Sequence, residues 1–255
     1  MSTTPANITA KTGWLWLKQG MTLFRQQPAA LTTVLFANVL LVLLLHAIPL
    51  LGQFIAVLLI PSFSMALMQA CLLIETQQRV TLPVLLTGFQ KPLVFKLIKI
   101  GVAYLAVVIL TTLPGLLVLG DTVLRGAPLT PGNITGGDAF VLMLCSVVQI
   151  FAIVALSFAA PLATWQDMPP VKALFYSFFA VWRSARVFVV MLMAWLGLFV
   201  LVSIIPRAVL GNTTVGFVVM AWVGFLFILL LQCAMFASYR QIFGLPGKAV
   251  SLAKP

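Results

Sequence analysis

The sequence predicts an all-α polytopic membrane protein with six transmembrane helices arranged as three pseudo-repeated hairpins. Of its 255 residues, 62% are hydrophobic and only 7% are charged, whereas a soluble domain carries roughly 25% charged residues. The apolar residues fall into continuous runs near the roughly 20 residues that a helix needs to cross a bilayer, and continuous runs favour helices over membrane strands. The predicted spans are Pro28–Pro49, Gln53–Ile74, Leu97–Leu119, Ala139–Thr164, Val187–Ile205 and Val215–Tyr239.

The distribution of basic residues predicts the orientation of these spans. The net charge is +11, and among the lysines and arginines only Arg125 and Arg207 lie on the side opposite the two termini. Cytoplasmic segments of membrane proteins carry an excess of lysine and arginine, so we expect a multi-pass protein with both termini in the cytoplasm. The charge then reflects topology and contact with the phospholipid bilayer, anionic lipids included, rather than binding to nucleic acid.

A unit made of one short amphipathic helix and two spans occurs three times along the chain. The segment Phe24-Arg25-Gln26-Gln27-Pro28, before the first span, resembles Phe89-Gln90-Lys91-Pro92, before the third. A looser match, Trp182-Arg183-Ser184-Ala185-Arg186, precedes the fifth. We therefore expect one integral membrane domain over 1–255, with repeats at 11–74, 81–164 and 169–240 and a cytoplasmic tail at 241–255.

Small side chains recur at steps of four in the even-numbered spans, in or towards their cytoplasmic halves. Small residues at this spacing allow helix backbones to approach closely in lipid, where packing drives association. We therefore expect the even-numbered spans to contact one another inside the bundle. The residues concerned are Ser62, Ala66, Ala70, Ala155, Ala159, Ala163, Ala234 and Ser238.

Two of the short segments have a basic face opposite an apolar and aromatic face. Before the first span, Lys11, Lys18 and Arg25 are spaced by seven and share one face, opposite Trp16, Leu17, Gly20 and Phe24. Before the fifth span, Lys172, Tyr176, Arg183 and Arg186 share a face, opposite Leu174, Phe178, Val181 and Ala185. Helices of this composition lie in the plane of the membrane interface, with aromatic rings at headgroup depth.

These helices have three candidate roles: to anchor and orient the bundle, to recognise anionic headgroups, or to bind a protein partner. Their basic side chains can extend to water while the stems cover apolar surface. The residues expected at the lipid interface are Lys18, Arg25, Lys91, Lys96, Lys172, Arg183, Arg186, Trp14, Trp16 and Trp182.

The titratable residues are too few and too scattered for catalysis. The chain has four acidic residues and one histidine, and they form no convergent group, no HExxH motif and no glycine-rich phosphate loop. The cysteines Cys71, Cys145 and Cys233 sit in apolar runs and are expected to pack as small hydrophobic residues. We therefore expect no enzymatic activity, no metal site and no cofactor.

Three uncharged polar residues fall deep in the spans, at Asn38, Gln149 and Gln232. Side chains of this kind form hydrogen bonds between membrane helices for about 1 kcal/mol each. The alternative is that they line the cavity of a carrier or channel for a small neutral or amphipathic solute.

The segment "PLATWQDMPPVKALFYSFFAVWRSARVFVVM" resembles the matching segment of the YciC-like inner-membrane proteins. These form part of a broader group that includes the membrane domain of glycerophosphoryl diester phosphodiesterases. The resemblance rests on Pro161, Asp167, Ala173, Ser177, Trp182 and Arg183, together with the opening residues Gly13, Trp14 and Trp16. It implies an uncharacterised six-span inner-membrane protein of proteobacteria and carries over no catalytic residue.

The function expected from the sequence is that of a non-enzymatic bacterial inner-membrane protein that interacts with lipids or scaffolds partners. A membrane-protein partner and a homo-oligomer are both compatible with the pattern. The carrier or channel is the second hypothesis.

Overall fold

The computed structural model describes residues 11–49, 51–124, 135–211 and 213–246, and within these ranges every regular element is a helix. Six helical segments are long and apolar enough to cross a membrane, which confirms the predicted fold class. They are α2 (Pro28–His46), α3 (Leu51–Glu75), α4 (Leu93–Leu124), α5 (Gly136–Leu156) continued by α6 (Ala159–Trp165), α8 (Ala185–Leu210) and α9 (Thr214–Phe243). The short helices are α1 (Lys11–Gln26), η1 (Leu82–Phe89) and α7 (Pro170–Arg183).

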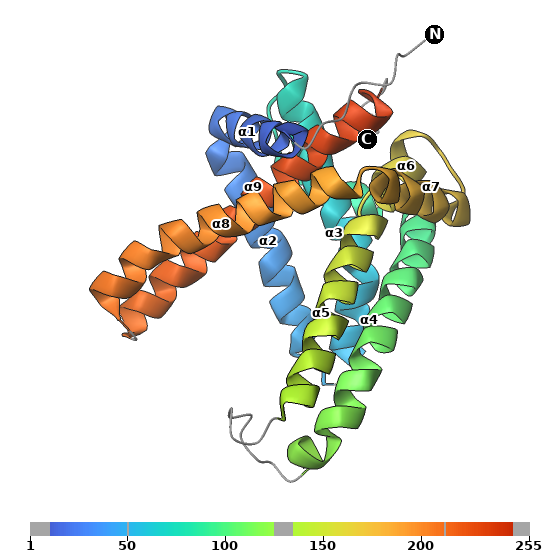
Figure 1. The fold of residues 1–255 in the computed structure, drawn as a ribbon. Coiled ribbons are helices and arrows are strands. Elements are labelled where there is room, and N and C mark those ends of the chain that lie inside the picture. The colour runs from blue at the N-terminus through green and yellow to red at the C-terminus, as the bar shows by residue number, and fades with distance from the viewer. Residues whose placement is uncertain (1–10, 50, 125–134, 212, 247–255) are drawn as a thin grey trace.

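The hairpins α2/α3, α4/α5 and α8/α9 meet at one end of the molecule, from which α8/α9 points away from the other two (Figure 1). Hairpin α8/α9 diverges from α4/α5, while α3 packs along α4. The end where they meet carries α1, α6, α7 and the last turns of α9. Of the lysines and arginines whose side chains the structure describes, all but Arg207 belong to segments at this end, which is called the basic end below.

The protein core lies at the basic end rather than at the middle of the helices. Residues 65–74 of α3 are all buried, as are residues 233–239 of α9. Along α4 and α5, by contrast, few side chains are buried within the protein. Helices that are apolar all round need a solvent of the same kind, so these outer halves present their side chains to acyl chains.

The small residues of the even-numbered spans form the inner contact that the sequence predicts. All eight are buried within the protein, and α3 packs against both α6 and α9. Further contacts join α6 to its neighbours, because the indole Nε1 of Trp165 donates to Oε1 of Gln69 at 3.0 Å and the Trp165 ring lies 5.0 Å from that of Tyr239. Close packing of small residues thus holds the three hairpins together at one end.

Each short helix packs on the hairpin of the preceding repeat. Helix η1 of the second repeat lies on α3 and α2, and α7 of the third repeat lies on α5 and α4. Helix α1 of the first repeat completes the cycle, because it packs on α9 and α8 of the third. The three repeats are therefore interlocked in a closed ring at the basic end.

The middle short segment departs from the amphipathic helix expected there. It is a 3-10 helix of eight residues that carries no charge, with Leu82 and Leu86 exposed and Val84 buried. The expected basic residue, Lys91, lies just after this helix and is exposed.

The fourth span is not the continuous helix expected over 139–164. Helix α5 ends at Leu156 and α6 begins at Ala159. The backbone N–H of Phe158 donates to Oγ of Ser177 at 3.1 Å, and that hydroxyl donates to the carbonyl of Ala155 at 2.6 Å. Pro161 contributes to the break, because a proline has no N–H for the carbonyl one turn earlier and its ring crowds that carbonyl.

Candidate functional site at the basic end

Helix α1 turns its aromatic face into the protein. Trp16 is 0% exposed, its ring centroid lies 5.1 Å from that of Phe188 in α8, and its Nε1 donates to Oε1 of Gln241 at 2.5 Å. This corrects the expected position of Trp16 at the lipid interface, because the side chain has no surface left for lipid. The other expected interface residues of this helix, Trp14, Lys18 and Arg25, are exposed.

Two glycines allow α1 to approach the third hairpin this closely. A Cβ at Gly13 would lie 2.5 Å from the carbonyl oxygen of Val187, and one at Gly20 would lie 2.7 Å from the backbone nitrogen of Ala234. Backbone atoms cannot move aside as a flexible side chain can, so any larger residue would push the helices apart.

Helix α7 is attached through small residues and turns its aromatic side chains outward. Ala173, Ser177 and Val181 are buried against its neighbours. Of the apolar face predicted for this helix, Phe178 is instead exposed, and its ring stacks on Trp182 with centroids 5.9 Å apart. The exposed aromatic residues of α7 are Phe175, Tyr176, Phe178, Phe179 and Trp182.

Basic side chains lie among these aromatic residues. Lys172, Arg183 and Arg186 are exposed, and the Nζ of Lys172 lies 5.7 Å from the ring centroid of Tyr176, within the range of a cation–π contact. The exposed aromatic residues of α7 together with these three basic residues are called the α7 surface below. It is cationic, aromatic and accessible.

Lys96, another expected interface residue, is engaged within the protein. Its ammonium forms an ion pair with Asp167, which lies two residues before Pro169 at the start of α7. The hydrogen bond and the charge of Lys96 lower the pKa of the Asp167 carboxyl from its usual value. The pair ties the chain before α7 to the first turn of α4, so Lys96 is less available to headgroups than Lys91.

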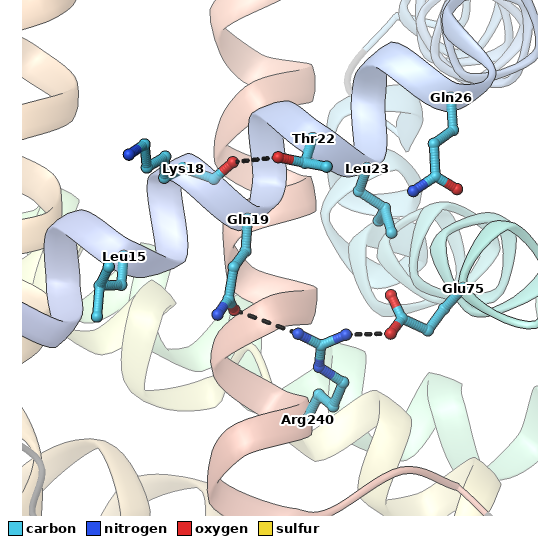
Figure 2. A pocket seen from close by; sticks show the side chains of 8 residues that line it. All are labelled: Leu15, Lys18, Gln19, Thr22, Leu23, Gln26, Glu75 and Arg240. Carbon is cyan, nitrogen blue, oxygen red and sulfur yellow. Dashed lines mark hydrogen bonds and ion pairs between the residues drawn. The ribbon is translucent and has the colours of Figure 1, made fainter.

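A surface pocket of about 350 Å³ opens where α1 crosses the ends of α3 and α9. Figure 2 shows the guanidinium of Arg240 between Glu75 and Gln19, with Nη1 donating to Oε1 of Glu75 and Nη2 to Oε1 of Gln19 at 3.3 Å. The side chains of Glu75 and Arg240 are 25% and 28% exposed. The pocket is lined by Leu15, Lys18, Gln19, Thr22, Leu23, Gln26, Glu75 and Arg240.

Sequence patterns did not indicate this pocket. Gln19 and Arg240 are 221 residues apart in the chain, and Glu75 and Arg240 are 165 apart. The available signal was that a lone acid ends the second span while an arginine ends the sixth, which is a complementary pair if the even-numbered spans meet.

The intramembrane polar residues do not come together. Asn38 is 6% exposed, and its Nδ2 donates to the carbonyl of Phe63 at 3.4 Å, as expected for a bond between helices. Gln149 and Gln232 are half-buried and lie outside the pocket described above. Asn38 therefore seals a helix contact instead of lining a cavity, which weakens the carrier hypothesis.

Two of the three cysteines have the packing role that the sequence predicts for all three. Cys71 and Cys233 are buried, with their sulfur atoms 3.8 Å apart between α3 and α9. Cys145 is half-buried. In the part of the chain that the structure describes, no three His, Cys, Asp or Glu side chains gather in a way that could hold a metal ion.

These features define a multi-pass membrane protein with six helical spans and a closed ring of short helices at one end. A curated protein of Burkholderia thailandensis, described as a probable inner membrane protein, is 31% identical to this chain over 250 residues, which cover 93% of each chain. The chain belongs to the family of that protein and is a multi-pass inner-membrane protein. No protein-family model and no solved structure matches the chain, so the YciC-like grouping is not confirmed.

Proposed function

We propose that this protein is a non-enzymatic inner-membrane protein whose basic end faces the cytoplasm and binds anionic lipid headgroups through the α7 surface. The observation that carries the proposal is the outward direction of both the aromatic and the basic side chains of α7. A helix that served only to pack the bundle would bury its aromatic residues, as α1 buries Trp16.

The chemistry of the α7 surface suits the region between acyl chains and water. Tryptophan and tyrosine are enriched at this depth because one part of the ring is apolar and another is polar. Each lysine or arginine near an anionic surface contributes about 1 kcal/mol of attraction. Lys172, Arg183 and Arg186 would together favour anionic over zwitterionic lipids by about 3 kcal/mol at low salt.

The ring of short helices supports a role in holding lipids rather than in passing solutes. The exposed cations of α1 and α7 stand at the same end of the molecule, on helices that interlock different repeats. Headgroups bound there would contact several repeats at once. The core beneath the ring is packed with small and aromatic side chains such as Ala163 and Phe236.

Lipid retention measured by native mass spectrometry tests the proposal. Protein from nanodiscs of mixed phosphatidylglycerol and phosphatidylcholine should retain phosphatidylglycerol preferentially. A variant with Lys172→Gln, Arg183→Gln and Arg186→Gln should lose most of that preference, because the cations are removed and the aromatic residues remain. Arg207→Gln, at the opposite end, is the matched control and should retain it. Equal retention by the triple variant and the control would refute the role of α7.

The orientation is tested separately. A green fluorescent protein fused after Pro255 should be fluorescent if the carboxyl terminus is cytoplasmic, and an alkaline phosphatase fused at the same point should be inactive. The reverse pattern would refute the proposed orientation of the basic end.

A further inference from the structure

We infer that the pocket between α1, α3 and α9 binds a phosphoethanolamine group, which carries a primary ammonium and a phosphate. The inference concerns a site apart from the α7 surface, and it rests on the proposed function only in that lipid headgroups are taken to reach the basic end.

The pocket offers an acceptor and donors side by side. Glu75 uses Oε1 in its bond to Arg240, and among the described residues nothing donates to its Oε2. The guanidinium of Arg240 has N–H groups beyond those directed at Glu75 and Gln19. The ion pair in Figure 2 is therefore incompletely satisfied on both sides, and both partners are accessible from the pocket.

A group with one sign of charge fits this arrangement poorly. A phosphate alone would be attracted by Arg240 and repelled by Glu75. An ammonium alone would be attracted by Glu75 and repelled by Arg240. A zwitterion can place its phosphate near Arg240 and its ammonium near Glu75, so that each charge of the protein pair meets its opposite. Because both side chains are about three-quarters buried, these contacts are screened less than contacts on an open surface.

The remaining walls of the pocket suit the headgroup of an amphiphile. Leu15 is exposed at one side, and Leu23 forms a buried wall. Gln19 and Gln26 add amide groups that can bond to phosphate oxygens. Lys18 borders the pocket and points away from Arg240 in Figure 2, which places a second cation at the rim. The volume of about 350 Å³ lies within the range of roughly 300–1,000 Å³ for small-molecule sites.

The required chemistry is a phosphate joined to an ammonium that still carries N–H donors. Phosphatidylethanolamine meets this requirement. Phosphatidylcholine has the same phosphate but three methyl groups in place of the ammonium protons, so it cannot donate to Glu75. Phosphatidylglycerol lacks the cation. Free phosphoethanolamine in the cytoplasm carries the same two groups and is the other source.

The test compares these ligands on the full-length protein in nanodiscs. By native mass spectrometry, the wild type should retain phosphatidylethanolamine over phosphatidylcholine. Glu75→Gln should lower that preference about tenfold, as expected for loss of a charge-assisted hydrogen bond. Retention of phosphatidylglycerol should not fall in this variant, because the pocket becomes more cationic. A purely structural role of Glu75 would instead lower the retention of all lipids together with the melting temperature.

Further variants keep the test decisive if Glu75→Gln does not fold. Lys18→Gln, at an exposed position of α1, should weaken phosphatidylethanolamine retention about fivefold through loss of one cation at the rim. The triple substitution in the α7 surface should leave phosphatidylethanolamine retention unchanged. The proposal for the α7 surface and the inference for the pocket can therefore be refuted separately. Equal retention of phosphatidylethanolamine and phosphatidylcholine by the wild type would show that the phosphoethanolamine group in the pocket does not come from a lipid.

A titration with soluble phosphoethanolamine covers the other source. Saturable binding to the wild type that Glu75→Gln weakens would support the site with a free ligand. The absence of any preference for phosphatidylethanolamine, together with no saturable binding of soluble phosphoethanolamine, would overturn the inference.

Discussion

Helices α1 and α7 have nearly the same sequence pattern, but α1 turns its aromatic face into the protein whereas α7 turns its aromatic side chains outward. Both have basic residues on one side and aromatic residues on the other or among them, and both precede a transmembrane hairpin. Helix α1 buries Trp16 completely, whereas α7 leaves Trp182 61% exposed. Amphipathic periodicity therefore shows that a helix has two faces, but not whether the aromatic face meets protein or lipid.

The small residues of the two helices account for the difference. Gly13 and Gly20 allow α1 to lie against the backbones of α8 and α9, and Trp16 then fills the space between them. Helix α7 approaches its neighbours with Ala173 and Ser177, while Phe178 and Trp182 pack edge-on against Phe151 of α5 and remain exposed. The position of the smallest residues thus determines which face packs inward.

The largest expected difference between the two helices is in stability. Trp16→Ala should lower the free energy of unfolding by about 3–5 kcal/mol, because it empties a fully enclosed site. Trp182→Ala should change it by about 0.5 kcal/mol or less, as for other surface positions. Unfolding in detergent, followed by circular dichroism, measures both. Equal losses would show that the two tryptophans have the same environment.

The second largest expected effect on stability concerns the close approach of α1 to α9. Gly20→Val should destabilise the protein by about 3 kcal/mol, because the added carbons meet the backbone of Ala234. The control is Gly224→Ala in α9, where a Cβ has open space around it and the substitution should be neutral or slightly stabilising. A tolerated Gly20→Val would mean that α1 does not lie against α9.

The attachment of α7 is expected to be weaker. Ser177→Ala removes the partner of the Phe158 N–H at the break between α5 and α6, and a buried donor left without a partner costs about 2 kcal/mol. The same variant should increase hydrogen exchange at Phe158. Ser146→Ala in α5, where the hydroxyl is exposed, is the control. If Ser177→Ala leaves stability and exchange unchanged, the break does not depend on α7.

The smallest effect concerns pH and the ion pair before α7. Because Lys96 lowers the pKa of Asp167 in the folded state, the pair stabilises the fold above the unfolded pKa of about 4 and loses this contribution as the pH falls further. The melting temperature of the wild type should therefore decrease slightly more below about pH 4 than that of Lys96→Gln. Parallel curves for the two proteins would show that the pair adds nothing to stability.

Much of the fold follows from the sequence because a bilayer allows few alternatives. Span lengths predict the helices, and the steps of four predict the buried contact that Ala66, Ala159 and Ala234 make. Contacts between distant segments could not be predicted in this way. The break in the fourth span depends on Ser177, which is supplied from another helix, and the packing of α1 on the third hairpin depends on two glycines that the apolar pattern does not distinguish.

The candidate site was predicted only in part for the same reason. Exposure of Lys172 and Arg183 follows from their positions on the basic face of one short helix. The pocket around Glu75 and Arg240 requires the ends of α3 and α9 to meet under α1, which is a property of the ring of repeats and not of any single segment.

The contrast between Trp16 and Trp182 can be measured directly by fluorine NMR. The protein is labelled with 5-fluorotryptophan at its six tryptophans, and the signals of Trp16 and Trp182 are assigned with the variants Trp16→Phe and Trp182→Phe. The nanodiscs contain a small share of a lipid that carries a paramagnetic headgroup. The Trp182 signal should broaden strongly while the Trp16 signal stays sharp, because only the former reaches the interface. Equal broadening of both signals, or broadening of Trp16 alone, would contradict the orientations of α1 and α7.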